Sequence, residues 1–458
     1  MTFNVLSQQL PSTAVPALLP VQGADLQVPL ATGGQTRYAN FDYAASAPAL
    51  TEVVRKLDQA LPFYSSVHRG AGWASQVSTG LYETSRARIG KALGAADDQV
   101  VVFTRNTTDA LNLLATCVPA DAGDVLVLDL EHHANLLPWQ RHNHRFVPTA
   151  ATLELTIARI EQELSDGQVA LLSITGASNV TGEELPIGRL AALAHRYGAR
   201  ICVDAAQLAP HRRVDLTALD VDYLALSGHK LYAPYGAGVL VGRRDWLDQA
   251  TPYLAGGGAV RNVSTEAVDW APAPARHEAG TPNVLGAVAL AAALHTLGAL
   301  PAGALEVHES TLRERLLAGL ATLPEVSVVN IWSDSPSSIG VVTFQVEGYD
   351  PGLLAAILSA EHGIGVRDGK FCAHPLLNRL GVSAGAVRAS LGVGSSSADV
   401  DRLVEALRTV LAEGPQLAYH LVDGRYAPVA DPRQLPDWLV DQAADAAPVF
   451  AASPCQEA

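Results

Sequence analysis

The chain has 458 residues, of which 48% are hydrophobic and 17% charged, and this composition predicts a globular protein with more than one domain. Its net charge of −15 argues against general affinity for nucleic acid or an anionic membrane, although a small basic pocket for a phosphate is compatible with it. The four cysteines are scattered and include no Cys-x-x-Cys pair, so they indicate neither a disulfide scaffold nor a zinc site and favour a cytoplasmic location.

The composition changes along the chain in a way that predicts four segments. Residues 1–36 contain no Lys or Arg, so they lack the basic start of a signal or transit peptide and are expected to form an irregular arm. We expect a large domain over residues 37–299, a small domain over 300–413 and an extension over 414–458. The extension is rich in Pro, Ala and acidic residues from Asp431 onward and is expected to be partly mobile there.

Apolar runs and apolar spacing predict alternating strands and helices in the first half of the chain. Strands are expected at residues 100–103, 125–128, 170–174, 200–204 and 221–226, with a further one in 231–241 that is entered through small residues. Helices are expected at 81–93, 110–116 and 185–197. This alternation is typical of a parallel sheet with both faces covered. Residues 284–305 carry no Asp, Glu, Lys or Arg, and we interpret them as a buried helix rather than a membrane span.

The second half predicts a different mixture of elements. Helices are expected at residues 306–323, 353–361 and 399–411, a strand at 339–346, and a hairpin at 420–428 around Asp423-Gly424.

Two reactive residues follow neighbouring predicted strands. Asp204 ends one strand, and Ser227-Gly228-His229-Lys230 follows the next, which places a hydroxyl, an imidazole and an amine together. Ligands of parallel sheets lie beyond the carboxyl ends of strands. A lysine there can form a Schiff base with a carbonyl cofactor, and an aspartate can keep the ring nitrogen of pyridoxal phosphate protonated. Each also has an ordinary interpretation, a solvated strand end for Lys230 and a helix cap for Asp204.

A possible anion site precedes them. Thr107 and Thr108 supply hydroxyls at the start of a predicted helix, where free N–H groups favour a bound anion. An ordinary helix N-cap has the same appearance.

Asp204-Ala205-Ala206-Gln207 together with Ser227-Gly228-His229-Lys230 resembles the class V aminotransferase group of fold-type I pyridoxal-phosphate enzymes, and within it the SUF-type cysteine desulfurases and selenocysteine lyases. The resemblance extends from about Tyr38 to about Leu411. It implies an α/β, aspartate-aminotransferase-like large domain with a mostly parallel sheet, a smaller α+β domain, and a homodimer with shared active sites.

The resemblance implies a role for each polar residue near the strand ends. His132 stacks on the cofactor ring, with His133 as an alternative that the sequence does not separate, and Asn179 contacts the ring oxygen. Thr281 reaches the phosphate of the neighbouring subunit. The implied cofactor-binding residues are Thr107, Thr108, His132, Asn179, Asp204, Gln207, Ser227, His229, Lys230 and Thr281. No metal is implied.

The implied substrate site uses residues from both predicted domains. Arg388 grips the substrate carboxylate through two parallel hydrogen bonds. His68 and Arg69 line the pocket of the neighbouring subunit, or else form an exposed polar loop. Cys372 aligns with the sulfur-accepting cysteine. Arg367 or Lys370 would raise its thiolate fraction.

The chain departs from the SUF-type pattern directly before this cysteine. The usual loop reads Arg-x-Gly-His-His-Cys-Ala, whereas residues 367–373 read Arg-Asp-Gly-Lys-Phe-Cys-Ala. The departure bears on proton handling, on docking of an accessory scaffold and on the choice of substrate.

The predicted function is that of a pyridoxal-phosphate-dependent cysteine desulfurase, with Lys230, His132 and Cys372 as catalytic residues. It converts L-cysteine to L-alanine, leaves a persulfide on Cys372 and passes the sulfur to an acceptor protein. A C–S lyase or selenocysteine lyase, a class V aminotransferase or epimerase, and a cofactor-bearing scaffold without turnover are the alternatives. Cys117 is interpreted as a buried small hydrophobe and Cys455 as incidental.

Overall fold

A computed structural model describes residues 14–439 of the chain, which pack as two compact units. The larger unit comprises Ala44–Glu306 and Asn330–Ile339, and the smaller unit comprises the remaining described residues. The domain limits expected from the sequence stay a prediction, because a packing unit need not coincide with a domain that folds alone. The two units are therefore described separately.

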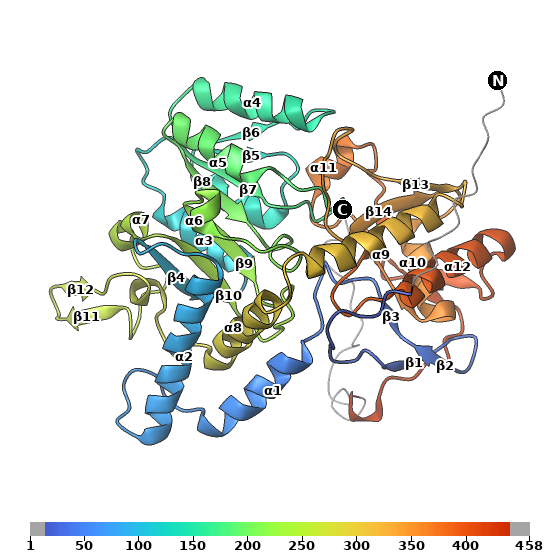
Figure 1. The fold of residues 1–458 in the computed structure, drawn as a ribbon, viewed down its shortest axis with the longest axis horizontal. Coiled ribbons are helices and arrows are strands. Elements are labelled where there is room, and N and C mark those ends of the chain that lie inside the picture. Colours follow the sequence, from blue (N-terminus) through green and yellow to red (C-terminus); the bar gives the residue numbers. More distant parts are fainter. Residues whose placement is uncertain (1–13, 440–458) are drawn as a thin grey trace. The chain divides into compact units, whose positions relative to one another are not determined.

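A seven-stranded sheet forms the centre of the larger unit, in the order β4-β10-β9-β8-β7-β5-β6 (Figure 1). Strands β9, β8, β7, β5 and β6 pair in parallel, and β10 runs antiparallel to both of its neighbours. The mostly parallel sheet expected from the sequence is thereby confirmed. The strands are β4 (Gln99–Thr104), β5 (Asp124–Leu128), β6 (His144–Val147), β7 (Val169–Thr175), β8 (Arg200–Asp204), β9 (Tyr223–Ser227) and β10 (Gly238–Arg243).

Helices cover both faces of this sheet. Val125, Leu126 and Val127 are consecutive in β5 and all have an exposed fraction of 0%, although neighbouring side chains on a strand point to opposite faces. Burial on both faces explains why these strands read as continuous apolar runs. The helices of the unit are α1 (Thr51–Ala60), α2 (Trp73–Ala92), α3 (Thr107–Cys117), α4 (Leu153–Ser165), α5 (Ile187–Arg196), α6 (Leu216–Leu219), α7 (Arg244–Gln249) and α8 (Val284–Gly298).

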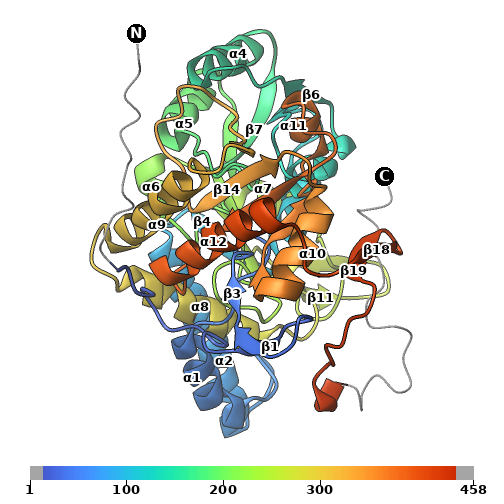
Figure 2. The ribbon, with the colours of Figure 1, turned by 90° about the vertical axis from the view of Figure 1, so that its right-hand side faces the viewer.

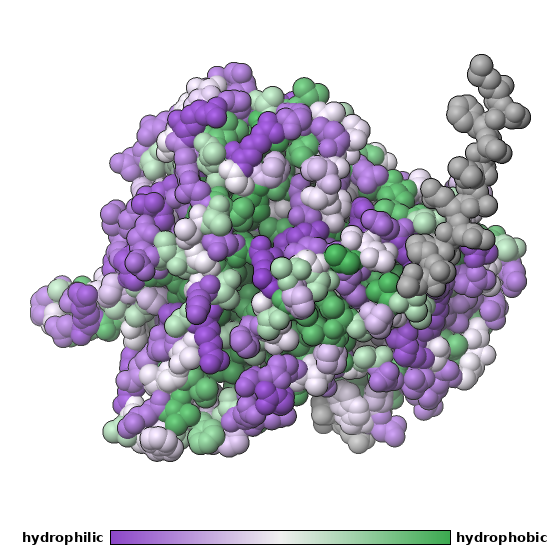
Figure 3. Space-filling view, in the orientation of Figure 1, coloured by the Kyte–Doolittle hydropathy of each residue, from purple (hydrophilic) through white to green (hydrophobic). Residues whose placement is uncertain are grey.

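Short elements complete the larger unit. The hairpin of β11 (Val260–Val263) and β12 (Val268–Trp270) extends away from the sheet (Figure 1). Four 3-10 turns are η1 (Leu61–Phe63), η2 (His133–Asn135), η3 (Leu137–Arg141) and η4 (Ala275–His277). Hydrophilic side chains predominate on the face drawn in Figure 3, in keeping with a strongly acidic chain.

The apolar stretch 284–305 does not form one helix. Helix α8 ends at Gly298, and α9 (Ala304–Leu320) begins after Pro301 and Gly303, whose φ of +79° suits a glycine. No helix within residues 14–439 is both long enough and apolar enough to cross a membrane.

An antiparallel sheet of four strands, in the order β13-β14-β17-β16, forms the smaller unit. Leu316 of α9, Phe344 of β14 and Leu407 of α12 lie in one apolar core, so the helices pack on the sheet and give the α+β arrangement expected (Figure 2). The elements are β13 (Val326–Val328), β14 (Val341–Val346), β16 (Arg367–Gly369), β17 (Ala386–Ser390), α10 (Pro351–His362), α11 (His374–Arg379) and α12 (Ser397–Glu413).

Segments far apart in sequence join in this unit. Strand β3 (Ala39–Asn40) pairs in parallel with β15 (Ile364–Gly365), which places the segment before Ala44 in the smaller unit. The hairpin expected near Asp423-Gly424 is confirmed as β18 (Tyr419–Val422) and β19 (Arg425–Pro428). Glu361 of α10 anchors it by accepting hydrogen bonds from the N–H of Leu417 (3.1 Å) and the hydroxyl of Tyr419 (2.9 Å).

One expectation for the N-terminal arm is wrong. Strands β1 (Gln27–Pro29) and β2 (Gln35–Arg37) form a hairpin where an irregular segment was expected. Gly33 and Gly34 have φ of +100° and +79°, and these glycines allow the tight turn that brings the short strands together. The start of the arm, most of the tail expected to be mobile, and Cys455 lie outside the described residues.

Candidate active site

The carboxyl ends of four neighbouring strands bring the predicted cofactor residues to one edge of the larger sheet. His132 follows β5, Asn179 follows β7, Asp204 is the last residue of β8, and Lys230 follows β9. These strands are adjacent in the order β9-β8-β7-β5, so their ends share one edge. This is the edge at which parallel sheets hold ligands.

Asp204 and Lys230 lie close enough to influence each other. Asp204 is buried, and burial raises the pKa of its carboxyl. The N–H of Ala206, 2.9 Å from the carboxylate, and the positive charge of Lys230 both act in the opposite direction. Burial and then the charge of Lys230 lower the pKa of the His229 imidazole. The larger unit therefore holds an amine and a buried acid in one electrostatic neighbourhood.

The start of α3 meets the end of β9. The Ser227 hydroxyl accepts a hydrogen bond from the Thr107 N–H at 2.7 Å, and the two hydroxyls are 2.8 Å apart. Gly238 permits this approach, because a Cβ there would lie 2.7 Å from the Cα of Asn106. Thr107 is buried and Thr108 is exposed in the same first turn. Hydroxyls and N–H groups at a helix N-terminus form a suitable cradle for an anion.

Two buried amides lie past the neighbouring strand ends. The Gln207 amide donates to the carbonyl of Ala44 at 2.8 Å, while its own oxygen is buried and has no hydrogen-bond partner among residues 14–439. Leaving such an oxygen unpaired costs about 1–3 kcal/mol, which indicates a place for a hydrogen-bonding ligand. Asn179 is also buried.

Backbone contacts fix the protonation pattern of His132. Its Nδ1 accepts a hydrogen bond from the N–H of Ala134 at 3.0 Å, so the neutral imidazole carries its proton on Nε2. The His133 ring lies 6.2 Å away and is tilted by 43°. Nε2 of His132 is therefore a donor in the neutral ring.

Glu131, next to His132, is a buried acid that the sequence reasoning missed. Its carboxylate accepts hydrogen bonds from the N–H of Thr175 (2.9 Å) and the amide of Asn135 (2.8 Å), and Asn135 accepts one from the indole of Trp139 (3.1 Å). Burial raises the pKa of Glu131 to about 8 against the effect of these donors. The only sequence signal was an acid beside two histidines after an apolar strand.

Replacing Glu131 with glutamine should change how stability depends on pH. A folded-state pKa of about 8, above the usual 4.5, means that the stabilisation is fully present below pH 4.5 and is lost as the pH rises through 8. The wild type should therefore lose on the order of 4 kcal/mol between pH 5 and 8.5 that Glu131→Gln does not lose. Urea unfolding at a series of pH values measures the difference.

The control for this experiment is Glu161→Gln, which changes a half-exposed carboxylate of α4. It should follow the wild-type curve. Equal pH slopes for the wild type and Glu131→Gln would contradict the expectation.

His68, Arg69 and Thr281 form a separate exposed group on the larger unit. The Arg69 guanidinium lies against Gly257, whose carbonyl accepts a hydrogen bond from the N–H of Gly280 at 2.9 Å. His68 contacts Glu83 at 2.8 Å. The structure thus places the two loops that carry the predicted intersubunit residues side by side.

The smaller unit brings Cys372 and Arg388 into one neighbourhood. Phe371 and the half-buried Cys372 have φ of +53° and +52°, a left-handed conformation that costs free energy for residues other than glycine and often occurs at functional sites. The Phe371 ring centroid lies 5.1 Å from Cζ of Arg388. Burial lowers the pKa of the Arg388 guanidinium to about 10, while Asp42 and Cys372 act in the opposite direction.

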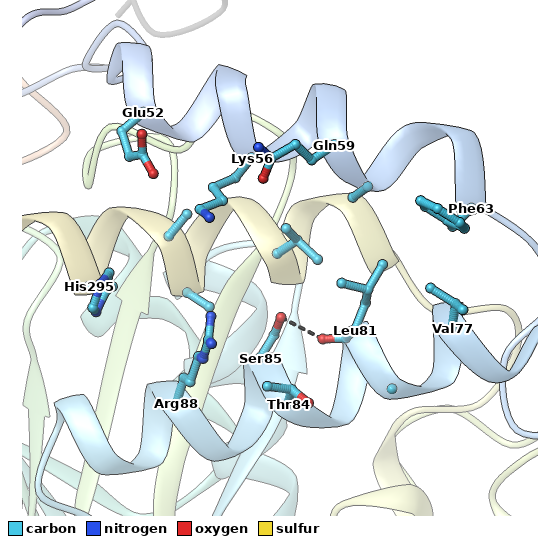
Figure 4. Close-up of a pocket in the computed structure, with 15 residues that line it drawn as sticks. Glu52, Lys56, Gln59, Phe63, Val77, Leu81, Thr84, Ser85, Arg88 and His295 are labelled. Carbon is cyan, nitrogen blue, oxygen red and sulfur yellow. Dashed lines mark hydrogen bonds between the residues drawn. The ribbon is translucent and has the colours of Figure 1, made fainter. Parts of the chain in front are cut away.

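A pocket of about 410 Å³ lies elsewhere in the larger unit, between α1, α2 and α8 (Figure 4). Lys56, Arg88 and His295 line one end of it, and Phe63 and Leu81 lie toward the other. None of the predicted catalytic or cofactor-binding residues lines this pocket. Within the described part of the chain, no group of three or more His, Cys, Asp or Glu residues is arranged to hold a metal ion.

Comparison with known proteins assigns the family. The profile described as Aminotransferase class-V matches residues 39–403, and the chain belongs to this family of pyridoxal-phosphate-dependent enzymes. The chain is similar to the cysteine desulfurase of Dickeya dadantii (strain 3937), with 37% identity over 81% of this chain and 92% of the relative. It is also similar to the cysteine desulfurase of Klebsiella pneumoniae (strain 342), with 38% identity over 76% and 86%.

Solved structures agree with this assignment. The cysteine desulfurase CsdA of Escherichia coli matches with a TM-score of 0.73 and 34% identity, over 82% of this chain and 95% of that one. The apo cysteine desulfurase of Thermococcus onnurineus NA1 matches with a TM-score of 0.76 and 32% identity, over 86% and 99%. The fold-type I architecture expected from the sequence is confirmed.

The residues at the sheet edge fit pyridoxal phosphate. The buried Asp204 carboxylate, which accepts a hydrogen bond from the N–H of Ala206, suits a protonated ring nitrogen. The Gln207 oxygen, unpaired among residues 14–439, suits a polar ring substituent. The contact between Thr107 and Ser227 at the start of α3 suits a phosphate.

Proposed function

We propose that this protein is a pyridoxal-phosphate-dependent cysteine desulfurase that converts L-cysteine to L-alanine and leaves a persulfide on Cys372. The observation that carries the proposal is the buried acid Asp204 in electrostatic contact with Lys230 at the ligand-binding edge of the sheet. The names of the similar relatives support the reaction class.

The proposed cofactor contacts follow from the position of each residue. Thr107, Thr108 and Ser227 hold the phosphate at the start of α3, and His229 lies beside Lys230 in the turn. His132 covers one ring face, Gln207 and Asn179 bind the ring oxygen, and Asp204 pairs with the ring nitrogen. When bound, the cofactor supplies a charged ring that withdraws electrons from the substrate α-carbon.

Lys230, His132 and Cys372 perform the proposed proton and sulfur transfers. The Lys230 amine takes the α-proton of the substrate, and His132 is the proposed donor of the proton that the β-carbon takes. The Cys372 thiolate attacks the substrate sulfur, so an S–S bond forms while the substrate C–S bond breaks. The substrate β-carbon keeps the electron pair of that bond and takes a proton. The α-carbon then takes a proton back from Lys230, which gives alanine.

Arg388 is the proposed anchor for the substrate carboxylate. Its guanidinium is buried, and the ring of Phe371 lies over it. Phe371 and Lys370 occupy the positions of the two histidines in the SUF-type pattern. In this chain an aromatic side chain therefore takes a position where that pattern supplies an imidazole, and Lys370 or Arg367 supplies positive charge near the thiol.

We further propose a homodimer with shared active sites, a cytoplasmic location and a sulfur-acceptor protein as partner. His68, Arg69 and Thr281 would reach the neighbouring subunit. Exposed apolar side chains in the larger unit support an interface, because Trp73, Leu254 and Val263 have exposed fractions of 74%, 53% and 58%.

Product analysis tests the proposed reaction. Incubation of the purified protein with L-cysteine should give alanine and, by mass spectrometry, a mass increase of one sulfur atom on the peptide that contains Cys372. Pyruvate with free sulfide would instead identify a C–S lyase. A bound cofactor without any product from a sulfur amino acid would leave only the scaffold role.

A further inference from the structure

Glu278 is an acid with a nearly buried side chain, three residues before Thr281 in the larger unit. The exposed fraction of this side chain is 8%, and each carboxylate oxygen accepts two hydrogen bonds. One oxygen accepts from Nη1 of Arg86 and from the N–H of Phe103, both at 2.7 Å. The other accepts from Nη2 of Arg86 at 2.7 Å and from the hydroxyl of Tyr82 at 2.9 Å. One carboxylate thus binds side chains of α2 and the backbone of β4.

The ion pair of Glu278 and Arg86 occupies the edge of the central sheet. Strand β4 lies at one edge of this sheet, so every second residue points its N–H and carbonyl away from β10. Glu278 binds the outward N–H of Phe103, and Nη1 of Arg86 donates to the carbonyl of Val101 at 2.8 Å. The guanidinium also packs on the Phe103 ring, with Cζ 4.9 Å from the ring centroid. These contacts, together with two parallel bonds between the partners, leave the pair little freedom to move.

The loop of residues 278–283 is exposed at Thr281 and is held on both sides of that residue. Glu278 fixes the start of the loop. The Asn283 side chain fixes the end, because it donates a hydrogen bond to the carbonyl of Tyr235 at 2.7 Å. The position of Thr281 therefore depends on the Glu278 contacts as well as on those of Asn283.

A series of charged contacts joins Glu278 to the other loop that we propose reaches the neighbouring subunit. His68 lies in that loop, and its Nε2 is 2.8 Å from the carboxylate of Glu83. The same carboxylate lies 3.0 Å from Nε of Arg86, which binds Glu278. The His68 ring also meets the Tyr82 ring edge-on, with the two centroids 5.9 Å apart. Arg86 and Glu278 therefore connect the two loops.

We propose that Glu278 is a positioning residue for the active site of the neighbouring subunit, where it sets the place of the Thr281 hydroxyl against the cofactor phosphate. The proposal rests on the proposed function, because it takes the homodimer with shared sites and the reach of Thr281 from there. Glu278 acts through Arg86 and the main chain of the loop. Displacement of the loop weakens a hydrogen bond to a charged group, and losing such a bond lowers affinity by about tenfold or more.

The first test separates the phosphate from the rest of the cofactor. The full-length dimer is equilibrated by dialysis against a series of concentrations of pyridoxal phosphate, or of pyridoxal, which lacks the phosphate. The visible absorbance of the lysine-bound form gives each dissociation constant. For Glu278→Gln, the constant for pyridoxal phosphate should rise about tenfold, while the constant for pyridoxal stays near its wild-type value. A general loss of structure would raise both constants.

Arg86→Lys is the second variant, because it keeps the positive charge but not the two parallel hydrogen bonds. It should raise the pyridoxal phosphate constant in the same way, so it decides the question if Glu278→Gln fails to fold. Asp245→Asn is the matched control. Arg200 donates two hydrogen bonds to Asp245, at 2.8 and 2.5 Å, and begins β8 at the sheet edge opposite the site. This control should leave both constants at their wild-type values.

Mixed dimers show whether Glu278 acts on its own site or on that of its neighbour. Two differently tagged chains are co-expressed, and successive affinity steps isolate the mixed dimer. When a Glu278→Gln chain is paired with a Lys230→Ala chain, the one site that keeps Lys230 receives an intact Thr281 loop and should bind pyridoxal phosphate like the wild type. When a wild-type chain is paired with a chain carrying both changes, that site receives the altered loop and should bind about tenfold less tightly.

The opposite pattern in the mixed dimers, or an equal loss of affinity for both ligands, would overturn the inference and leave Glu278 a structural ion pair. An unchanged pyridoxal phosphate constant in Glu278→Gln and Arg86→Lys, or the same loss in Asp245→Asn, would overturn it as well. A wild type that is monomeric, or that binds no pyridoxal phosphate and makes no alanine from L-cysteine, would instead refute the proposed function.

Discussion

Lys230→Ala should abolish cofactor retention in its covalent form and reduce alanine production from L-cysteine below detection. The amine is the only lysine at the carboxyl edge of the larger sheet among the described residues, and Asp204 lies within its electrostatic reach. Its loss removes both the covalent anchor and the base for the α-proton, and losing such a group lowers rates by several orders of magnitude. Borohydride reduction followed by peptide mass spectrometry should locate the cofactor on Lys230 in the wild type and nowhere in the variant.

Lys91→Ala provides the control, because Lys91 is an exposed residue in the last turn of α2. It should keep wild-type absorbance, labelling and alanine yield. If Lys230→Ala retained the visible absorbance of the lysine-bound cofactor and formed alanine at the wild-type rate, the catalytic assignment would be wrong.

Cys372→Ser should eliminate the protein persulfide and lower the rate of alanine formation by at least about a hundredfold. A hydroxyl is a far weaker nucleophile toward sulfur than a thiolate, so the C–S bond loses the group that accepts the sulfur atom. The strained backbone at Phe371 and Cys372 holds the thiol at a defined position, which a serine would keep without its reactivity. Mass spectrometry and alanine assays after L-cysteine treatment measure both effects.

The other thiols serve as internal comparisons. Burial raises the pKa of Cys117 to about 12 and also raises that of Cys202, so an alkylating reagent at pH 8 should modify Cys372 before either of them. Cys455→Ser should leave the persulfide yield unchanged. Persulfide formation that survives in Cys372→Ser would move the sulfur-accepting role to another cysteine.

The parallel part of the fold could be predicted from the sequence because its strands are buried on both faces. The run 170–174 lies within β7, every residue of which is buried, and such a run leaves a continuous apolar signal. The polar residues that follow each run predicted which edge of the sheet binds a ligand. Asp204 and Lys230 were both predicted as site residues for this reason. Asp204 and Lys230 are distant in sequence but lie close together because β8 and β9 are parallel neighbours in the sheet.

The roles of residues whose partners are far away in sequence could not be predicted from the sequence. Asp42 lies within the stretch over which the family resemblance extends, but its partner Arg388 is 346 residues further along the chain. No local sequence pattern predicts an ion pair over that separation. Glu131 is defined by a network with Asn135 and Thr175 that requires the folded β5-β7 pair. The N-terminal hairpin was missed because two strands of three residues carry too little periodicity to recognise.

The pairing of β3 with β15 has a consequence for synthesis on the ribosome. Ala39 pairs with Ile364, so β3 of the smaller unit cannot pair until more than 300 further residues have emerged. At translation rates of about 5–20 residues per second, this delay is roughly 15–65 s. During that time the backbone of β3 lacks its partner strand. Phe41, fully buried in the finished protein, must spend that interval either exposed or sheltered by a chaperone. The seven strands of the central sheet in the larger unit all precede residue 244, so this sheet can form before β15 has been synthesised.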